Sequence, residues 1–119
     1  MQIGQVAERT GLSLHTLRHY DDVDLLRPSA RSEGGFRLYT EGDVARLMVI
    51  RRMKPLGFTL EQMRELLEVT DALPGTSGAQ EAELRARLAE FVRLAEDARA
   101  RMLERVAMAE ELLGVLRSR

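Results

Sequence analysis

Hydrogen-bond donors gather on one face of a short predicted helix near the N-terminus. His15, Arg18, His19 and Asp22 recur at the three- and four-residue spacing that places side chains on one side of a helix, and Thr16 lies at the edge of that face. Asp22, at the far end, is the one member of the face that is not a donor. Arginine can bond guanine edges or phosphate oxygens, while threonine and histidine can donate to phosphates. The face therefore suits the major groove of a nucleic acid, and a merely solvated surface is the alternative.

A local excess of arginine marks residues 25–40, where Arg27, Arg31 and Arg37 stand against a single glutamate. A Gly-Gly pair indicates a turn, and the apolar and polar side chains after it, from Phe36 on, alternate with the period of a half-buried strand. We expect a β-hairpin whose arginines clamp phosphates or enter a minor groove. A hairpin with a purely structural role is the alternative.

Other kinds of chemistry find little support in the sequence. His15 and His19 stand four residues apart, which suits metal chelation, but no third ligand accompanies them. The chain has no cysteine, so disulfides, thiolate metal sites and cysteine-held clusters are excluded. No nucleophile–base pair or glycine-rich phosphate loop is present. We therefore expect a protein that is not an enzyme and that holds no metal or cofactor.

The donor face is positioned by a predicted helix-turn-helix. A first helix of about two turns ends at Gly11, which can take the positive φ of a tight turn. Ser13 can cap the second helix, which runs to about residue 22 and turns Leu17 toward the first helix, with Leu14 and Tyr20 beside it. An ordinary helical hairpin is the alternative.

Two further helices are predicted after the hairpin. Thr40 can cap one that runs to about residue 54, before a Pro and a Gly, and residues 59–62 form a capping box for another that runs to about residue 69. Three segments follow from these patterns: a domain over 1–70, a linker rich in turn-forming residues over 71–79, and one helix over 80–117.

The long helix carries an apolar stripe with heptad spacing. A helix of about 38 residues spans roughly 55 Å and cannot bury this stripe on so small a domain, so a second copy of the chain is its simplest partner. Beyond Met102, a strict heptad passes through Arg105 and Leu112, whereas a stutter passes through Val106 and Leu113. The expected pairing residues are Leu84, Leu88, Phe91, Ala95, Ala98, Met102, Ala109, Leu112, Leu113 and Leu116.

Together these motifs resemble the signature of MerR-type transcriptional regulators, over about residues 2–69 and with the long helix in the expected place. Asp24 stands where the family usually has glycine, and Asp tolerates a left-handed backbone better than most residues. His19 replaces a common aromatic residue. The resemblance is carried by residues 3–7, 11–13, 16–21, 25–28, 35–39 and 56–60.

The resemblance implies a mainly α fold, in which a winged helix-turn-helix DNA-binding domain precedes a long antiparallel coiled-coil helix. It implies a homodimer that binds a near-palindromic operator in double-stranded promoter DNA and distorts it, which affects RNA polymerase indirectly through the promoter. An unknown small molecule or protein could act as effector, although the chain has no cysteine metal site and no added ligand domain. The residues expected to contact DNA are Ser13, His15, Thr16, Arg18, His19, Tyr20, Arg31, Arg37 and Tyr39.

Bulk composition does not favour this interpretation, because the formal net charge is −1. A coiled-coil interaction module, or an architectural DNA binder without promoter-specific regulation, is therefore the alternative function. No apolar run approaches the roughly 18–20 residues of a membrane span, and no secretion signal follows Met1, so we expect a cytoplasmic protein without a membrane partner.

Overall fold

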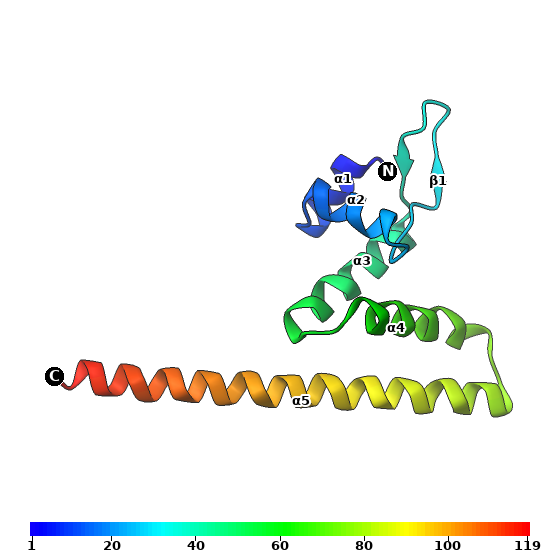
Figure 1. The fold of residues 1–119 in the computed structure, drawn as a ribbon. Coiled ribbons are helices and arrows are strands. Elements are labelled where there is room, and N and C mark those ends of the chain that lie inside the picture. The colour runs from blue at the N-terminus through cyan, green and yellow to red at the C-terminus, as the bar shows by residue number, and fades with distance from the viewer. The chain divides into compact units, whose positions relative to one another are not determined.

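The computed structural model describes residues 1–119, which form two compact units, residues 1–67 and 68–119. The elements follow in the order α1, α2, β1, β2, α3, η1, α4, η2 and α5 (Figure 1). The chain is mainly helical, as the sequence predicts. None of its helices combines the length and the apolarity that crossing a bilayer requires.

The first two helices form the predicted helix-turn-helix. α1 (Ile3–Thr10) ends at Gly11, whose φ of 72° is left-handed and whose N–H donates to the carbonyl of Ala7 at 2.9 Å. α2 (Leu14–Asp22) is capped by Ser13, whose hydroxyl accepts from the backbone N–H of Thr16 at 3.0 Å. Both local signals in the sequence are confirmed, and they set the start of the helix that carries the donor face.

The predicted hairpin is present as a small two-stranded wing. β1 (Ala30–Arg31) pairs antiparallel with β2 (Arg37–Leu38), which sets Arg31 opposite Arg37. The N-terminal backbone lies beside β2: the N–H of Tyr39 donates to the carbonyl of Met1 at 2.7 Å, and the amino group of Met1 donates to the carbonyl of Tyr39 at 2.8 Å. The wing is thereby fastened to the start of α1.

The expected alternation along the second strand is wrong. Phe36 is 66% exposed, whereas Tyr39 is only 3% exposed and belongs to the core. The paired strand contains two residues, so its pleat does not extend to Phe36, which lies in the turn beside Gly34. Tyr39 follows the paired residues, and its side chain packs in the core of the first unit.

Asp43 closes the base of the wing. α3 (Glu41–Met53) begins with a capping box formed by Thr40 and Asp43. The buried carboxylate of Asp43 accepts from the backbone N–H of Thr40 at 2.9 Å, and from the N–H and hydroxyl of Ser29 at 3.2 and 2.7 Å. One side chain therefore joins both ends of the hairpin to the first turn of α3.

The third and fourth helices meet at a tight turn. α3 is followed by η1 (Lys54–Leu56) and by Gly57, whose φ of 83° lies in the left-handed region that favours glycine. α4 (Leu60–Ala72) starts at the predicted capping box, in which Thr59 and Gln62 bond each other's backbone N–H groups at 3.1 and 2.9 Å. The helix ends a few residues later than expected.

The core of the first unit gathers apolar side chains from every helix and from the wing. Leu14, which the sequence placed beside Leu17, is instead 40% exposed, because it is the first residue of its helix. Leu60, the first residue of α4, is likewise 38% exposed. The buried residues of this core are Val6, Leu17, Tyr20, Leu25, Leu26, Tyr39, Val44, Leu47, Ile50, Met53, Met63 and Leu67.

The second unit is dominated by one helix. α5 (Gly78–Arg117) has 40 residues and so extends roughly 60 Å. The segment 71–79, which composition marks as a linker, is largely helical: α4 reaches Ala72 and η2 (Leu73–Gly75) follows. The hydroxyl of Thr76 closes this turn by donating to the carbonyl of Leu73 at 2.8 Å.

Candidate nucleic-acid interface

The predicted donor face of α2 is open to solvent. The side chains of His15, Arg18 and His19 are exposed, and Arg18 forms no hydrogen bond or ion pair within the chain. Ser13 and Thr16, at the N-terminus of the helix, bond each other through their hydroxyls at 2.8 Å. The face thus offers unpaired cationic and imidazole donors beside a helix N-terminus, a combination that attracts anions.

Two tyrosines that the family resemblance suggested as DNA contacts lie in the core. Tyr20 is 5% exposed, with its ring centroid 6.3 Å from that of His19, and burial raises the pKa of its phenol. Tyr39 is 3% exposed, its hydroxyl is buried without a hydrogen-bond partner, and burial raises its pKa as well. Their surroundings indicate packing as the main role of both rings.

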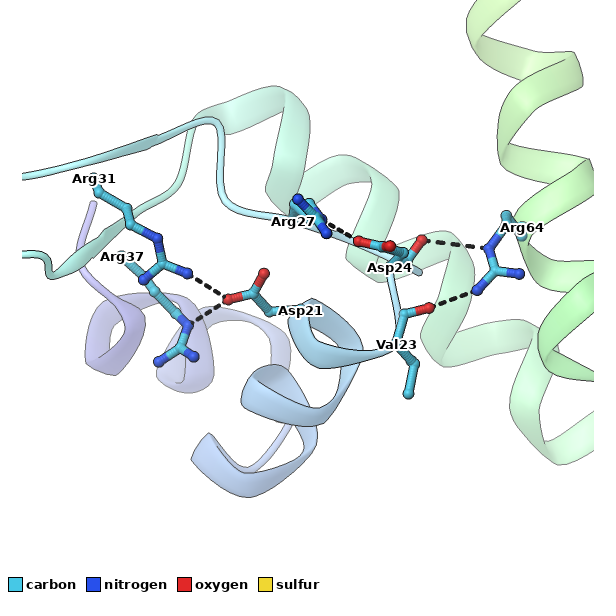
Figure 2. A network of polar contacts seen from close by, with 7 residues as sticks. All are labelled: Asp21, Val23, Asp24, Arg27, Arg31, Arg37 and Arg64. Atoms are coloured by element: carbon cyan, nitrogen blue, oxygen red, sulfur yellow. Dashed lines mark hydrogen bonds and ion pairs between the residues drawn. The ribbon is translucent and has the colours of Figure 1, made fainter.

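The wing arginines are bound to a carboxylate of α2. Asp21 accepts from Nη2 of Arg31 at 2.8 Å and from Nε of Arg37 at 2.7 Å (Figure 2). The Asp21 side chain is 9% exposed, whereas those of Arg31 and Arg37 are 48% and 23% exposed. The structure therefore brings both predicted wing residues to the end of the donor helix.

Sequence reasoning missed Asp21, although its position carries a signal. Asp21 follows Leu17 by four residues and so lies on the inward side of α2. A carboxylate that turns inward costs free energy unless cations or donors compensate it. The nearby surplus of arginine in the hairpin was the natural source of those partners.

A second polar cluster holds the carboxyl end of α2. Asp24 has a φ of 58°, the left-handed backbone expected at the position where the family uses glycine, and it is paired with Arg27. Arg64 of α4 donates to the carbonyl of Val23 at 2.5 Å and to that of Asp24 at 3.4 Å (Figure 2). A cation at the C-terminus of a helix is favourable for the helix dipole, so Arg64 anchors the donor helix from its far end.

No group of three or more histidine, cysteine or carboxylate side chains in the chain is arranged to hold a metal ion. His15 and His19 lie on the exposed face of α2 without a third ligand. Their position suits contact with a large anionic partner.

The apolar stripe of α5 changes character along its length. Leu84, Phe91 and Ala98, spaced seven residues apart, are 9%, 7% and 4% exposed. Leu88 and Ala95, between them, are half-buried. Beyond this point every residue is exposed, including Met102, Ala109, Leu112, Leu113 and Leu116 of the expected pairing residues. We call the exposed apolar side chains between residues 102 and 116 the distal stripe.

Comparison with known proteins identifies relatives over most of the 119-residue chain. The family model described as "MerR HTH family regulatory protein" matches residues 1–70, and that described as "MerR, DNA binding" matches residues 44–115. The HTH-type transcriptional regulator CueR of Yersinia pestis is 32% identical over 114 residues, which cover 96% of this chain and 82% of the relative.

Other matches are partial or more distant. The HTH-type transcriptional activator mta of Bacillus subtilis is 46% identical over 67 residues, which cover 56% of this chain but 26% of the activator, so this chain spans about a quarter of that protein. The crystal structure of HiNmlR, a MerR family regulator lacking the sensor domain and bound to promoter DNA, shares the fold with a TM-score of 0.72 at 24% identity. That alignment covers 95% of this chain and 86% of HiNmlR.

Proposed function

Because the chain belongs to the MerR family of helix-turn-helix DNA-binding transcriptional regulators, which are not enzymes, we propose that it controls transcription by distorting a promoter operator. The operator would be near-palindromic and would be bound by a homodimer. Because its target would be promoter DNA, the protein would act in the cytoplasm.

One observation carries this proposal: the exposed donor face of α2 and the arginine-bearing wing are joined through Asp21. A helix of this kind fits a major groove, and Arg18 is free to bond a base edge or a phosphate. The wing beside this helix would present Arg37 to the sugar–phosphate backbone of the DNA next to that groove. Phosphate contacts of this type fix register and can supply the roughly 1–6 kcal/mol that bending a site requires.

The homodimer is supported by the distal stripe. Met102, Val106, Leu113 and Leu116 are 37%, 51%, 42% and 58% exposed, although each is large and apolar. A contiguous apolar surface of this kind marks an interaction site, and a second copy of the same helix offers a matching stripe. Two copies related by a two-fold axis would read two half-sites, which is why the operator should be near-palindromic.

The test begins by letting the protein select duplexes from a random pool of about 30 base pairs. We expect enrichment of an inverted repeat, and affinity that falls steeply with salt because phosphates are neutralised. Substituting Arg18→Ala together with Arg37→Ala should abolish selection while the protein stays folded. Failure of the wild-type protein to enrich any sequence would refute operator binding.

The same double substitution separates regulation from the alternative function. A coiled-coil interaction module does not need base or phosphate contacts, so its cellular activity would survive the loss of both arginines. A regulator that acts through promoter DNA would lose its effect on a reporter gene placed behind the selected sequence. Retained reporter control by the double variant would therefore favour the interaction module.

A further inference from the structure

The carboxylate of Asp21 faces the interior of the first unit, whereas that of Asp22 faces solvent. The Asp21 carboxylate is nearly buried, and Oδ2 accepts from two guanidinium groups that come from different strands of the wing. Asp22, the next residue of α2, is exposed, and its charge acts on Arg37 only through a Coulomb attraction weaker than that of Asp21. A desolvated carboxylate between two arginines leaves a cluster with a net charge of +1, and it fixes the wing relative to the donor helix.

The two arginines commit their donors differently. Arg31 uses Nη2 on Asp21 and Nη1 on the carbonyl of Gly35, at 2.8 and 3.3 Å. Arg37 meets Asp21 through Nε alone, and its two terminal nitrogens point away from the carboxylate (Figure 2). The terminal nitrogens of a guanidinium form a planar fork that matches two oxygens of one phosphate.

We propose that Asp21 is a positioning residue for DNA binding, which aims the terminal fork of Arg37 at one backbone phosphate and keeps Arg31 as a strut between the wing and α2. This inference rests on the operator binding proposed above. Fixing Arg37 in advance reduces the side-chain freedom that is lost when the phosphate arrives. A carboxylate near the DNA thus strengthens binding to a polyanion.

The sign of this effect separates the proposal from simple electrostatics. Removing a negative charge close to DNA raises affinity if only the net field matters. Removing the group that orients Arg37 lowers affinity, because the fork is no longer held. Asp21→Asn keeps the size of the side chain, so the direction of its effect decides between the two.

The experiment measures the affinity of the full chain for the duplex that the wild-type protein selects, over a range of salt concentrations. Each copy in the homodimer should lose one charge-assisted contact, worth about tenfold. Asp21→Asn should therefore weaken binding about 100-fold and reduce the slope of log K against log salt by about two. Asp22→Asn is the matched control: it removes the same charge one residue away and should leave affinity unchanged or slightly higher.

A double-mutant cycle identifies the route of the effect. If Asp21 acts through Arg37, then Asp21→Asn should change affinity little in a chain that already carries Arg37→Ala. A general loss of structure would weaken binding by the same factor in both backgrounds. Equal losses in the two backgrounds, or an Asp21→Asn affinity at or above that of the wild-type protein, would overturn the proposal.

A third variant covers the case in which Asp21→Asn does not fold. Arg37→Lys keeps the positive charge but has no planar fork, so it should also weaken binding of the homodimer about 100-fold, or about tenfold per copy. Wild-type affinity in Arg37→Lys would then refute the role of the fork. Absence of binding by the wild-type chain itself would mean that the proposed function has failed, which is a different result from either of these.

Discussion

The phase of the distal stripe can be tested by comparing Leu112→Glu with Leu113→Glu. On a straight helix, Leu113 lies about 20° from Met102, whereas Leu112 lies about 80° away on the opposite side. The register through Leu112 also places Arg105 in the seam, and the register through Leu113 places Val106 there instead. We therefore expect the Leu113 substitution to disrupt pairing of two chains more strongly.

The size of the effect follows from burial. Leu113 is 42% exposed in the single chain, so pairing can still remove a large part of this side chain from water. Full burial of a leucine contributes about 1.5–3 kcal/mol, so burying the 42% that is still exposed contributes about 0.6–1.3 kcal/mol. Symmetry counts each substitution twice, so the loss is about 1.3–2.5 kcal/mol. At about 1.4 kcal/mol per tenfold change, the dimer Kd should rise by about 10- to 60-fold.

Sedimentation equilibrium at several protein concentrations measures this Kd directly. Leu103→Glu provides a control, because Leu103 is also exposed but lies about 100° around the helix from Met102. We expect dissociation in the order Leu113, then Leu112, then Leu103. A larger effect at Leu112 than at Leu113 would refute the stutter, and a wild-type chain that stays monomeric at micromolar concentration would refute the homodimer.

Three further predictions concern the first unit and the helix backbone. Asp43→Ala should lower the free energy of unfolding by about 2–3 kcal/mol, because buried donors at the wing base lose their acceptor; urea denaturation measures this. Gly57→Ala should cost about 1–2 kcal/mol at a φ of 83°, whereas Gly114→Ala inside α5 should gain about 0.5–1 kcal/mol, and thermal melts compare the two. The hydrogen bond from Arg9 lowers the pKa of Glu41. The pair therefore stabilises the fold fully at pH values above the ordinary pKa of a glutamate, and this stabilisation is lost as the pH falls through the lowered pKa. Glu41→Gln should flatten acid unfolding, and high salt should shrink the difference between the two proteins.

The helix boundaries were predictable because their signals are local. Ser13, Thr40 and Thr59 each cap a helix through a backbone N–H three residues ahead, and such pairs can be found in the sequence alone. Gly11 is similar, since a left-handed turn depends mainly on the residue that adopts it. The helix-turn-helix therefore follows from short-range physical chemistry.

The partners of the wing were not predictable in the same way. Asp21 meets arginines ten and sixteen residues away, and Tyr39 pairs through its backbone with Met1, 38 residues away. Alternation of apolar residues assigns faces only where a strand is long enough to carry a pleat. In two-residue strands, contacts distant in sequence decide which side chain is buried.

The stripe of α5 shows a different limit of periodicity. A heptad pattern predicts that a face is buried but does not name what buries it. Leu84, Phe91 and Ala98 are already buried in the single chain, so the first part of the predicted seam needs no second copy to be covered. The distal stripe is therefore the part of the pattern that a partner helix must account for.

The net charge of −1 gives a misleading impression of the surface that would meet DNA. Burial, more than composition, determines which charges face a ligand, and Asp21 and Asp43 are 8% and 3% exposed. Asp21 turns its charge toward arginines, while Arg18 projects into solvent without a partner. The field at the donor face is thus more positive than a count of residues implies. It follows that the two acidic residues at the end of α2 should have opposite effects on DNA affinity. The buried Asp21 should support binding, and the exposed Asp22 should weakly oppose it.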